Sequence, residues 1–278
     1  LVSWVVIQLF GVTTFILRIP SIATGLLSCA VVFVIIKKIF RNEWLALCSM
    51  ILFACLPVSV FYMLYARGVM FEILFAVLSS YLLYSYLQQR PAFSQIMLLA
   101  ILNALGVWSM LSHFYFIVIS SFAVTIYLLL QQEKQWRFMI MYPLLSFICS
   151  TALLLPMLTG TGLAPGLTAG TADTNYLVLH FLPLHCYADF YTGMWFGMYL
   201  LIALHLYLIL LSAKIQFRFL HLLNVLLLFT PLIIKGISGA WLPERALAFL
   251  VIVPVISIGL LWNNFKSTIS SMLAFTIT

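Results

Sequence analysis

Long apolar stretches separated by short polar turns run through almost the whole chain. Residues 93–130 contain no Asp, Glu, Lys or Arg, and most of the other stretches carry very few. Runs of about 18 or more apolar residues are typical of helices that cross a bilayer. The strands of a membrane barrel would alternate polar and apolar positions, and these runs do not alternate. The pattern therefore predicts an all-α, polytopic transmembrane helical bundle.

The polar turns divide the chain into about nine full spans and a partial one, since each span needs ~20 residues. Residues 93–130 would be too long as one helix, so we expect two helices joined near Ser109–His113. Pro57 should kink the second span, and the turn Arg18–Ser21 should open the first. The expected spans are Ile19–Ile36, Trp44–Tyr62, Val69–Leu87, the two helices within Phe93–Leu130, Phe138–Pro156, Met194–Ala213, Phe219–Ile234, Ala246–Trp262 and, in part, Ser267–Thr278.

These spans form one transmembrane domain over residues 1–278, with a single long polar segment, Met157–Gly193. Loops of that length tend to be functional or disordered, and its aromatic second half favours packing onto the protein or the interface. We expect it to be an extracytoplasmic loop. The chain opens on Leu1 and stops within an apolar segment, which suggests a fragment of a longer protein.

The composition agrees with a membrane protein, since 65% of the residues are hydrophobic and only 7% are charged. A soluble domain carries about 25% charged residues. The net charge of +7 is attributed to Lys and Arg in cytoplasmic loops. No basic cluster with interleaved aromatics points to nucleic acid, and no C-x-x-C pair points to a zinc site.

The distribution of basic residues predicts how the chain is oriented across the membrane. Placing Lys37 on the cytoplasmic side puts most Lys and Arg residues there, as the positive-inside bias predicts. The remaining cations fall on the outer side, and they are Arg18, Arg67, Lys235 and Arg245. Several cations at one level suggest an anion site. The chain is thus expected to be a multi-pass integral membrane protein with these cations on its outer side.

Arg18 and Arg67 could grip a phosphate, because the guanidinium fork matches phosphate oxygens. Alternatively they could snorkel to lipid headgroups. Glu72 could be a hydrogen-bonded partner for a cation or a tyrosine of another helix, or else a general base or metal ligand. His113 could donate to a phosphate or a sugar hydroxyl, or could simply pack through a hydrogen bond.

No metal site is assigned, although a divalent metal is possible. Three candidate ligands share the long loop, namely His180, His185 and Asp189. Their spacing matches no metal-binding motif. His205 and His221 fall in or near spans on the cytoplasmic half and are interpreted as structural.

Several stretches resemble the GT-C superfamily of membrane glycosyltransferases, in particular the bacterial group similar to protein mannosyltransferases and the lipid A aminoarabinose transferase. Residues 8–40 resemble its Phe-Gly turn followed by Arg-hydrophobic-Pro-Ser and a basic end. Residues 61–72 resemble its Tyr-x-x-Glu-Ala-Arg turn, with Tyr65 where an acid is usual. Residues 112–116 resemble its Thr-His-Tyr-Phe turn, and residues 244–247 resemble its Pro-Arg-Tyr-Leu turn.

This resemblance implies inverting transfer of a sugar from a polyprenyl-phosphate donor to a lipid, glycan or protein acceptor at the outer membrane face. The donor phosphate would be held by Arg18, Arg67, Arg245 and Lys235. The substrate pocket would include Tyr65, Glu72, His113, Tyr115 and Glu244. The family's catalytic carboxylate precedes the segment that matches Leu1, so no catalytic residue is named and the fragment is expected to be inactive.

The alternative is a transporter or flippase for a lipid-linked or anionic solute. Such proteins favour broken helices, polar groups at mid-membrane and inverted repeats. The chain shows no such repeat, and its outer cations lie at one face rather than at mid-depth.

Overall fold

The computed structural model describes most of the chain as helix. The described residues are 8, 13–64, 68–89, 91–131, 135–161, 205–206, 215–238 and 244–263. Within some helices only the backbone is described, at residues 14, 57–58, 156–161, 215–216, 231–232, 234–238 and 244–247. In this part of the chain every regular element is a helix, which confirms the predicted all-α bundle.

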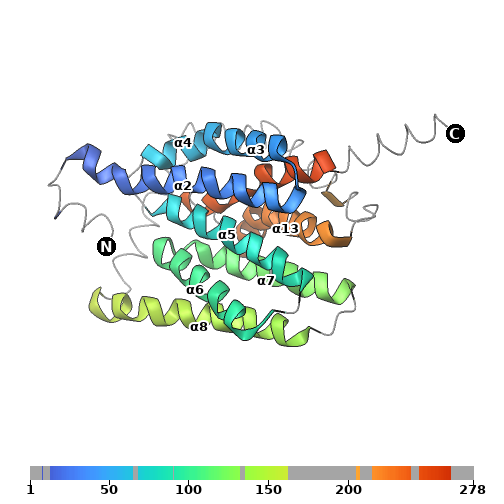
Figure 1. The fold of residues 1–278 in the computed structure, drawn as a ribbon. Helices are drawn as coiled ribbons and strands as arrows, with labels where there is room; N and C mark the ends of the chain where they lie inside the picture. The colour runs from blue at the N-terminus through green and yellow to red at the C-terminus, as the bar shows by residue number, and fades with distance from the viewer. Residues whose placement is uncertain are drawn as a thin grey trace.

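The helices run back and forth through the bundle, and α3 and α4 follow one another in the same direction along one side of it (Figure 1). They are α2 (Thr14–Phe40), α3 (Glu43–Cys55), α4 (Pro57–Leu64), α5 (Val69–Gln88), α6 (Phe93–Ser109), α7 (His113–Leu130), α8 (Trp136–Thr161), α13 (Ile215–Ser238) and the 3₁₀ helix η1 (Glu244–Val251), which continues as α-helix over 252–263. The spans expected at 194–213 and 267–278 lie almost entirely outside the described residues.

The start of α2 differs from the sequence prediction. Thr13 caps the helix by accepting a hydrogen bond from the Ile16 N–H at 3.2 Å, so the helix is already formed at Arg18. Pro20 lies inside α2, and the expected turn over residues 18–21 is wrong. Proline is tolerated within membrane helices because neighbouring groups can satisfy the freed carbonyl.

The kink expected at Pro57 is observed as a complete break between two helices. Leu56 adopts an extended conformation with ψ of 128°, so that α3 and α4 are separate helices. The ring of a proline disfavours helical geometry in the residue before it, which explains why the break falls at Leu56. The hairpin expected near Ser109–His113 is also observed, because α6 ends at Ser109 and α7 begins at His113.

The C-terminal end of α8 extends further than predicted. The helix runs to Thr161, so residues 157–161 of the segment assigned to the long loop are helical. The remainder of that segment lies outside the described residues. Membrane helices tolerate proline and glycine, so Pro156 and Gly160 do not end this helix.

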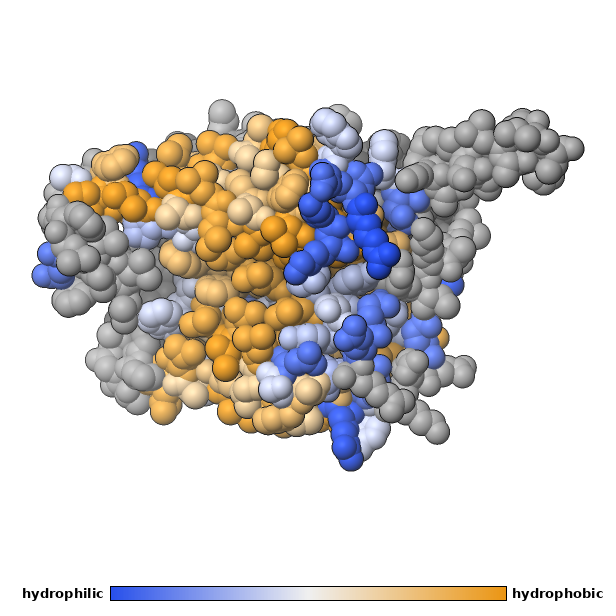
Figure 2. All heavy atoms as spheres, viewed as in Figure 1, coloured by the Kyte–Doolittle hydropathy of each residue, from blue (hydrophilic) through white to orange (hydrophobic). Residues whose placement is uncertain are grey.

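Four of the helices are long and apolar enough to cross a membrane: Phe15–Phe40, Val69–Gln88, His113–Leu130 and Trp136–Leu155. Shorter apolar helices accompany them at Glu43–Cys55, Phe93–Ser109, Phe217–Thr230 and Ala248–Asn263. Large hydrophobic side chains on the outside, such as Leu26 (63% exposed) and Phe122 (60% exposed), would meet lipid. Figure 2 shows a broad hydrophobic surface, with hydrophilic residues gathered toward the end of the bundle where α2 finishes.

We call that end the Lys37 end and the opposite one the Arg18 end. At the Lys37 end, the Phe40 and Phe217 rings stack at 5.4 Å and the Tyr84 and Phe217 rings at 6.4 Å between centroids. Tyr127 packs edge-on against Phe219 at 5.8 Å. Three helices from the first half of the chain, α2, α5 and α7, therefore hold the start of α13.

Candidate functional site

The start of α5 and the end of α6 meet at the Arg18 end. Gly68 precedes α5, and a Cβ atom at this position would overlap the carbonyl oxygen of Ser109. Only a glycine allows the two backbones to approach so closely without a shift. This contact brings the first turn of α5 next to the turn that joins α6 to α7.

Glu72 and Ser112 link these two turns. The Ser112 hydroxyl donates a hydrogen bond to Glu72 Oε1 at 2.7 Å. Ser112 stands at the N-cap of α7, where a serine usually accepts a bond from its own helix, yet it makes no such bond. Glu72 is fully buried, and its second oxygen, Oε2, has no partner in the described part of the chain.

Asn103 is the centre of a buried polar network next to this corner. Its Oδ1 accepts from Ser79 Oγ at 2.9 Å and lies 3.4 Å from His113 Nε2. Its Nδ2 donates to Tyr142 OH at 3.3 Å and to Ser146 Oγ at 3.2 Å. One side chain of α6 thus connects α5, α7 and α8.

His113 begins α7 and is completely buried. Its ring lies beside Phe116, at 5.1 Å between centroids, and Phe116 in turn packs against Phe249 at 6.2 Å. Gly106 makes room for the imidazole, because a Cβ there would come within 2.5 Å of His113 Nε2. η1, which contains Phe249, is therefore close to the first turn of α7.

The structure places the predicted site residues in three groups. Glu72, His113 and the half-buried Tyr115 lie on the first turns of α5 and α7. Arg18 lies on the exposed side of α2 near the same end of the bundle (Figure 1). For the remainder only a backbone position, or none, is described: Lys235 is in α13, Glu244 and Arg245 are in η1, and Tyr65 and Arg67 lie outside the described residues.

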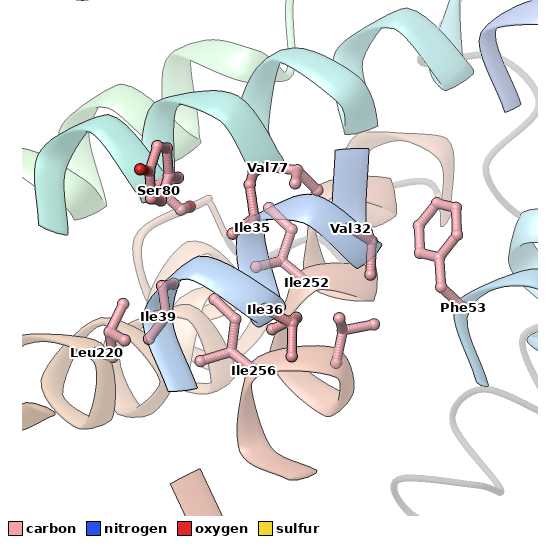
Figure 3. Close-up of a pocket in the computed structure, with 12 residues that line it drawn as sticks. Val32, Ile35, Ile36, Ile39, Phe53, Val77, Ser80, Leu220, Ile252 and Ile256 are labelled. Atoms are coloured by element: carbon pink, nitrogen blue, oxygen red, sulfur yellow. The ribbon is translucent and has the colours of Figure 1, made fainter. Parts of the chain in front are cut away.

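The aliphatic side chains of the core surround a cavity of about 20 Å³. Figure 3 shows Val32, Ile36 and Ile252 on its walls, together with Ser80. The Ser80 hydroxyl donates to the Ala76 carbonyl, so it offers the cavity no free hydrogen. A space of this size and lining suits at most a water-sized group and is not a site for a sugar or a phosphate.

A second buried polar cluster lies away from the Arg18 end corner. His205 Nδ1 is 3.0 Å from His221 Nδ1, and His205 Nε2 is 2.9 Å from Ser257 Oγ. Asn224 Nδ2 donates to the same serine at 3.2 Å. The cluster ties α13 to the helix over 252–263, as expected of structural histidines.

Within the described part of the chain, no three His, Cys, Asp or Glu side chains gather where they could hold a metal ion. The candidate ligands His180, His185 and Asp189 lie outside it.

The sequence analysis does not predict Asn103 or its partners Ser79, Tyr142 and Ser146, nor does it predict Ser112 as the partner of Glu72. The only signal for Asn103 is an amide in the middle of the uncharged stretch 93–130. Polar side chains in hydrocarbon need partners, so an isolated asparagine there predicts a contact with another helix. It does not predict which helix.

A family model described as dolichyl-phosphate-mannose-protein mannosyltransferase matches residues 1–159. The match covers more than half of the 278 residues. It includes the Gly68–Ser109 contact, the Glu72–Ser112 hydrogen bond and the whole Asn103 network. Neither a curated protein nor a solved structure matches the chain.

The resemblance drawn from short motifs is therefore confirmed at the level of the family. An apolar helical bundle with an inward-facing corner of polar side chains at one end is consistent with it. The chain is an integral membrane protein that belongs to the dolichyl-phosphate-mannose-protein mannosyltransferase family of membrane glycosyltransferases.

Proposed function

We propose that the protein transfers a sugar from a polyprenyl-phosphate-linked donor to an acceptor hydroxyl at the extracytoplasmic face of the membrane. The observation that carries this proposal is the family match over residues 1–159. The acceptor is a lipid, a glycan or a protein. The membrane is the bacterial inner membrane, with the Arg18 end facing outward, because Lys37, Lys38 and Arg41 gather at the opposite end.

The reaction is an inverting displacement. The acceptor oxygen attacks the anomeric carbon of the sugar from the face opposite the phosphate. A new C–O bond forms as the bond between that carbon and the phosphate oxygen breaks, and the polyprenyl phosphate leaves with the electron pair. The proton of the acceptor hydroxyl passes to a carboxylate base, for which we assign no residue.

Cationic side chains support this reaction by stabilising the charge that develops on the departing phosphate. We propose that Arg18, Arg67, Arg245 and Lys235 hold that phosphate. Arg18 is exposed at the end of the bundle where the first turns of α5 and α7 meet. Arg67 directly precedes Gly68, which contacts Ser109 at this end. Tyr65, Tyr115 and Glu244 would line the rest of the substrate pocket.

The experiment compares Arg67→Ala with Arg137→Ala in the full-length protein, in membranes supplied with radiolabelled polyprenyl-phosphate mannose. Arg137 is exposed near the start of α8, at the Lys37 end, and serves as the matched control. We expect Arg67→Ala to lower release of polyprenyl phosphate at least ~100-fold, as loss of a charged group from such a site does. Arg137→Ala should match the wild type. Wild-type release by Arg67→Ala would contradict the phosphate site.

The transporter alternative predicts movement of the lipid without cleavage of the sugar–phosphate bond. In the described part of the chain the mid-depth polar groups are bonded to one another around Asn103, and the cavity of Figure 3 is aliphatic. A polar path through the bilayer is therefore not seen there, and this favours the transferase. A wild-type protein that moves the donor but never cleaves it would reverse the choice.

A further inference from the structure

Several buried polar atoms lack a hydrogen-bond partner within the described part of the chain, and two of them belong to the first turns of α5 and α7. These two are Glu72 Oε2 and His113 Nδ1. Both side chains are completely buried, and the hydrogen bond from Ser112 to Glu72 places the start of α7, with His113 as its first residue, beside the first turn of α5. Buried polar groups are nearly always paired, so an unpaired couple at one corner calls for a ligand.

The Asn103 network determines what His113 can offer. The Ser120 hydroxyl lies 3.1 Å from the Ile117 carbonyl and 2.7 Å from the Tyr142 hydroxyl, and either hydroxyl can donate in the second pair. Tyr142 accepts from Asn103 Nδ2, which turns Asn103 Oδ1 toward His113. His113 Nε2 must therefore carry the proton, and a neutral ring presents a lone pair at Nδ1.

This assignment removes one of the roles considered for His113. A neutral imidazole whose only N–H points at Asn103 cannot also donate to a phosphate. It can accept a hydrogen bond from a donor that reaches Nδ1.

The Glu72 carboxyl can also offer only one atom to a ligand. Its Oε1 is engaged by Ser112, which leaves Oε2 as the atom available to a ligand. If the side chain is ionised, Oε2 accepts, and if it is protonated, Oε2 can donate. A hydroxyl group fits both states because it can donate and accept. A phosphate does not, since it would meet a carboxylate and an imidazole lone pair with no donor to hold it.

We propose that Glu72 and His113 form a subsite for hydroxyl groups of the transferred sugar, distinct from the cations that hold the donor phosphate. Ser112 is its positioning residue, because its hydroxyl orients the carboxyl of Glu72 instead of capping α7. The proposal rests on the proposed function, and it divides the substrate pocket into a sugar side and a phosphate side.

The test measures binding of two probes to the purified protein in lipid nanodiscs: polyprenyl-phosphate mannose and polyprenyl phosphate without sugar. The variants are Glu72→Leu, which removes both carboxyl oxygens, His113→Phe and Ser112→Ala. Each should weaken binding of the mannose-bearing probe about five- to tenfold, the effect of one lost hydrogen bond, and leave the sugar-free probe unchanged. Ser80→Ala is the control, because Ser80 is buried on the same helix as Glu72 but bonds only to the Ala76 carbonyl.

Equal losses for both probes would overturn the subsite and leave a structural role. Unchanged binding of the mannose-bearing probe would overturn it as well. If Glu72→Leu does not insert, Ser112→Ala carries the same test, because it removes only the hydrogen bond that orients the Glu72 carboxyl. Histidine ¹⁵N spectra add an independent readout: His113 should be protonated at Nε2, and a proton at Nδ1 would refute the assignment.

The two proposals can fail separately. If the variants abolish the preference for the mannose-bearing probe but the wild type never releases polyprenyl phosphate, the subsite stands and the transferase reaction is wrong. If the wild type transfers sugar and the variants weaken both probes alike, the transferase stands and the subsite is wrong.

Discussion

Asn103 should contribute more to stability than any single lipid-facing residue of α6. Asn103→Leu keeps nearly the same size but removes contacts to four side chains on three other helices: Ser79, His113, Tyr142 and Ser146. Hydrogen bonds between membrane helices are worth about 0.6 kcal/mol each. Four of them give about 2.4 kcal/mol, and buried partners left unpaired raise the expected loss to ~3 kcal/mol.

The assay is reversible unfolding in mixed micelles, followed by circular dichroism as the denaturing detergent increases. Ile101→Ala is the matched control, because Ile101 lies on the same helix with 44% of its surface exposed. Lipid tails are as apolar as this side chain, so its removal should change the unfolding free energy by less than ~0.5 kcal/mol. A leucine variant as stable as the wild type, or no worse than the control, would refute the role of the network.

Two further predictions concern the ends of the bundle. Gly68→Ala should destabilise the protein by about 1–3 kcal/mol, because the new Cβ meets the Ser109 carbonyl and only a backbone shift can relieve the overlap; unaltered unfolding would show that α5 and α6 adjust freely. Glu43 pairs with Lys37 at 2.6 Å, which lowers the pKa of that carboxyl from its ordinary value of 4.5. The contribution of this pair should be present above pH 4.5 and lost as the pH falls through the lowered pKa. Both side chains are exposed, so Glu43→Gln should leave the thermal midpoint at pH 7 unchanged, and a clear drop would contradict a surface role.

Much of the fold follows from local rules. The interruption at Pro57 follows from the backbone chemistry of proline, and the turn near Ser109–His113 follows from the length of a stretch too long for one helix, and both are observed. The start of α2 was not predicted correctly, because Thr13 offers a capping oxygen and membrane helices accept Pro20. Whether the helix begins at the capping residue or at the proline depends on the surrounding helices, which the local sequence does not specify.

The site was harder to predict than the fold. The sequence shows Glu72 and His113 as polar residues in apolar surroundings, which makes them candidates for a functional site. Their roles depend on partners that lie far away in the chain, such as Ser112, 40 positions from Glu72. Which side chain meets which is decided by the rotation and depth of each helix, and the apolar pattern leaves both undetermined.

The aromatic packing around α13 has a consequence for how the protein is made. Phe40, Tyr84 and Tyr127 belong to helices that leave the ribosome well before Phe217 and Phe219. Domains form from the N-terminus during synthesis at about 5–20 residues per second. For several seconds the newly inserted helices would thus present an open aromatic groove to lipid, and α13 would close it on arrival. Insertion of α13 would therefore complete the packing of helices that are already in the membrane.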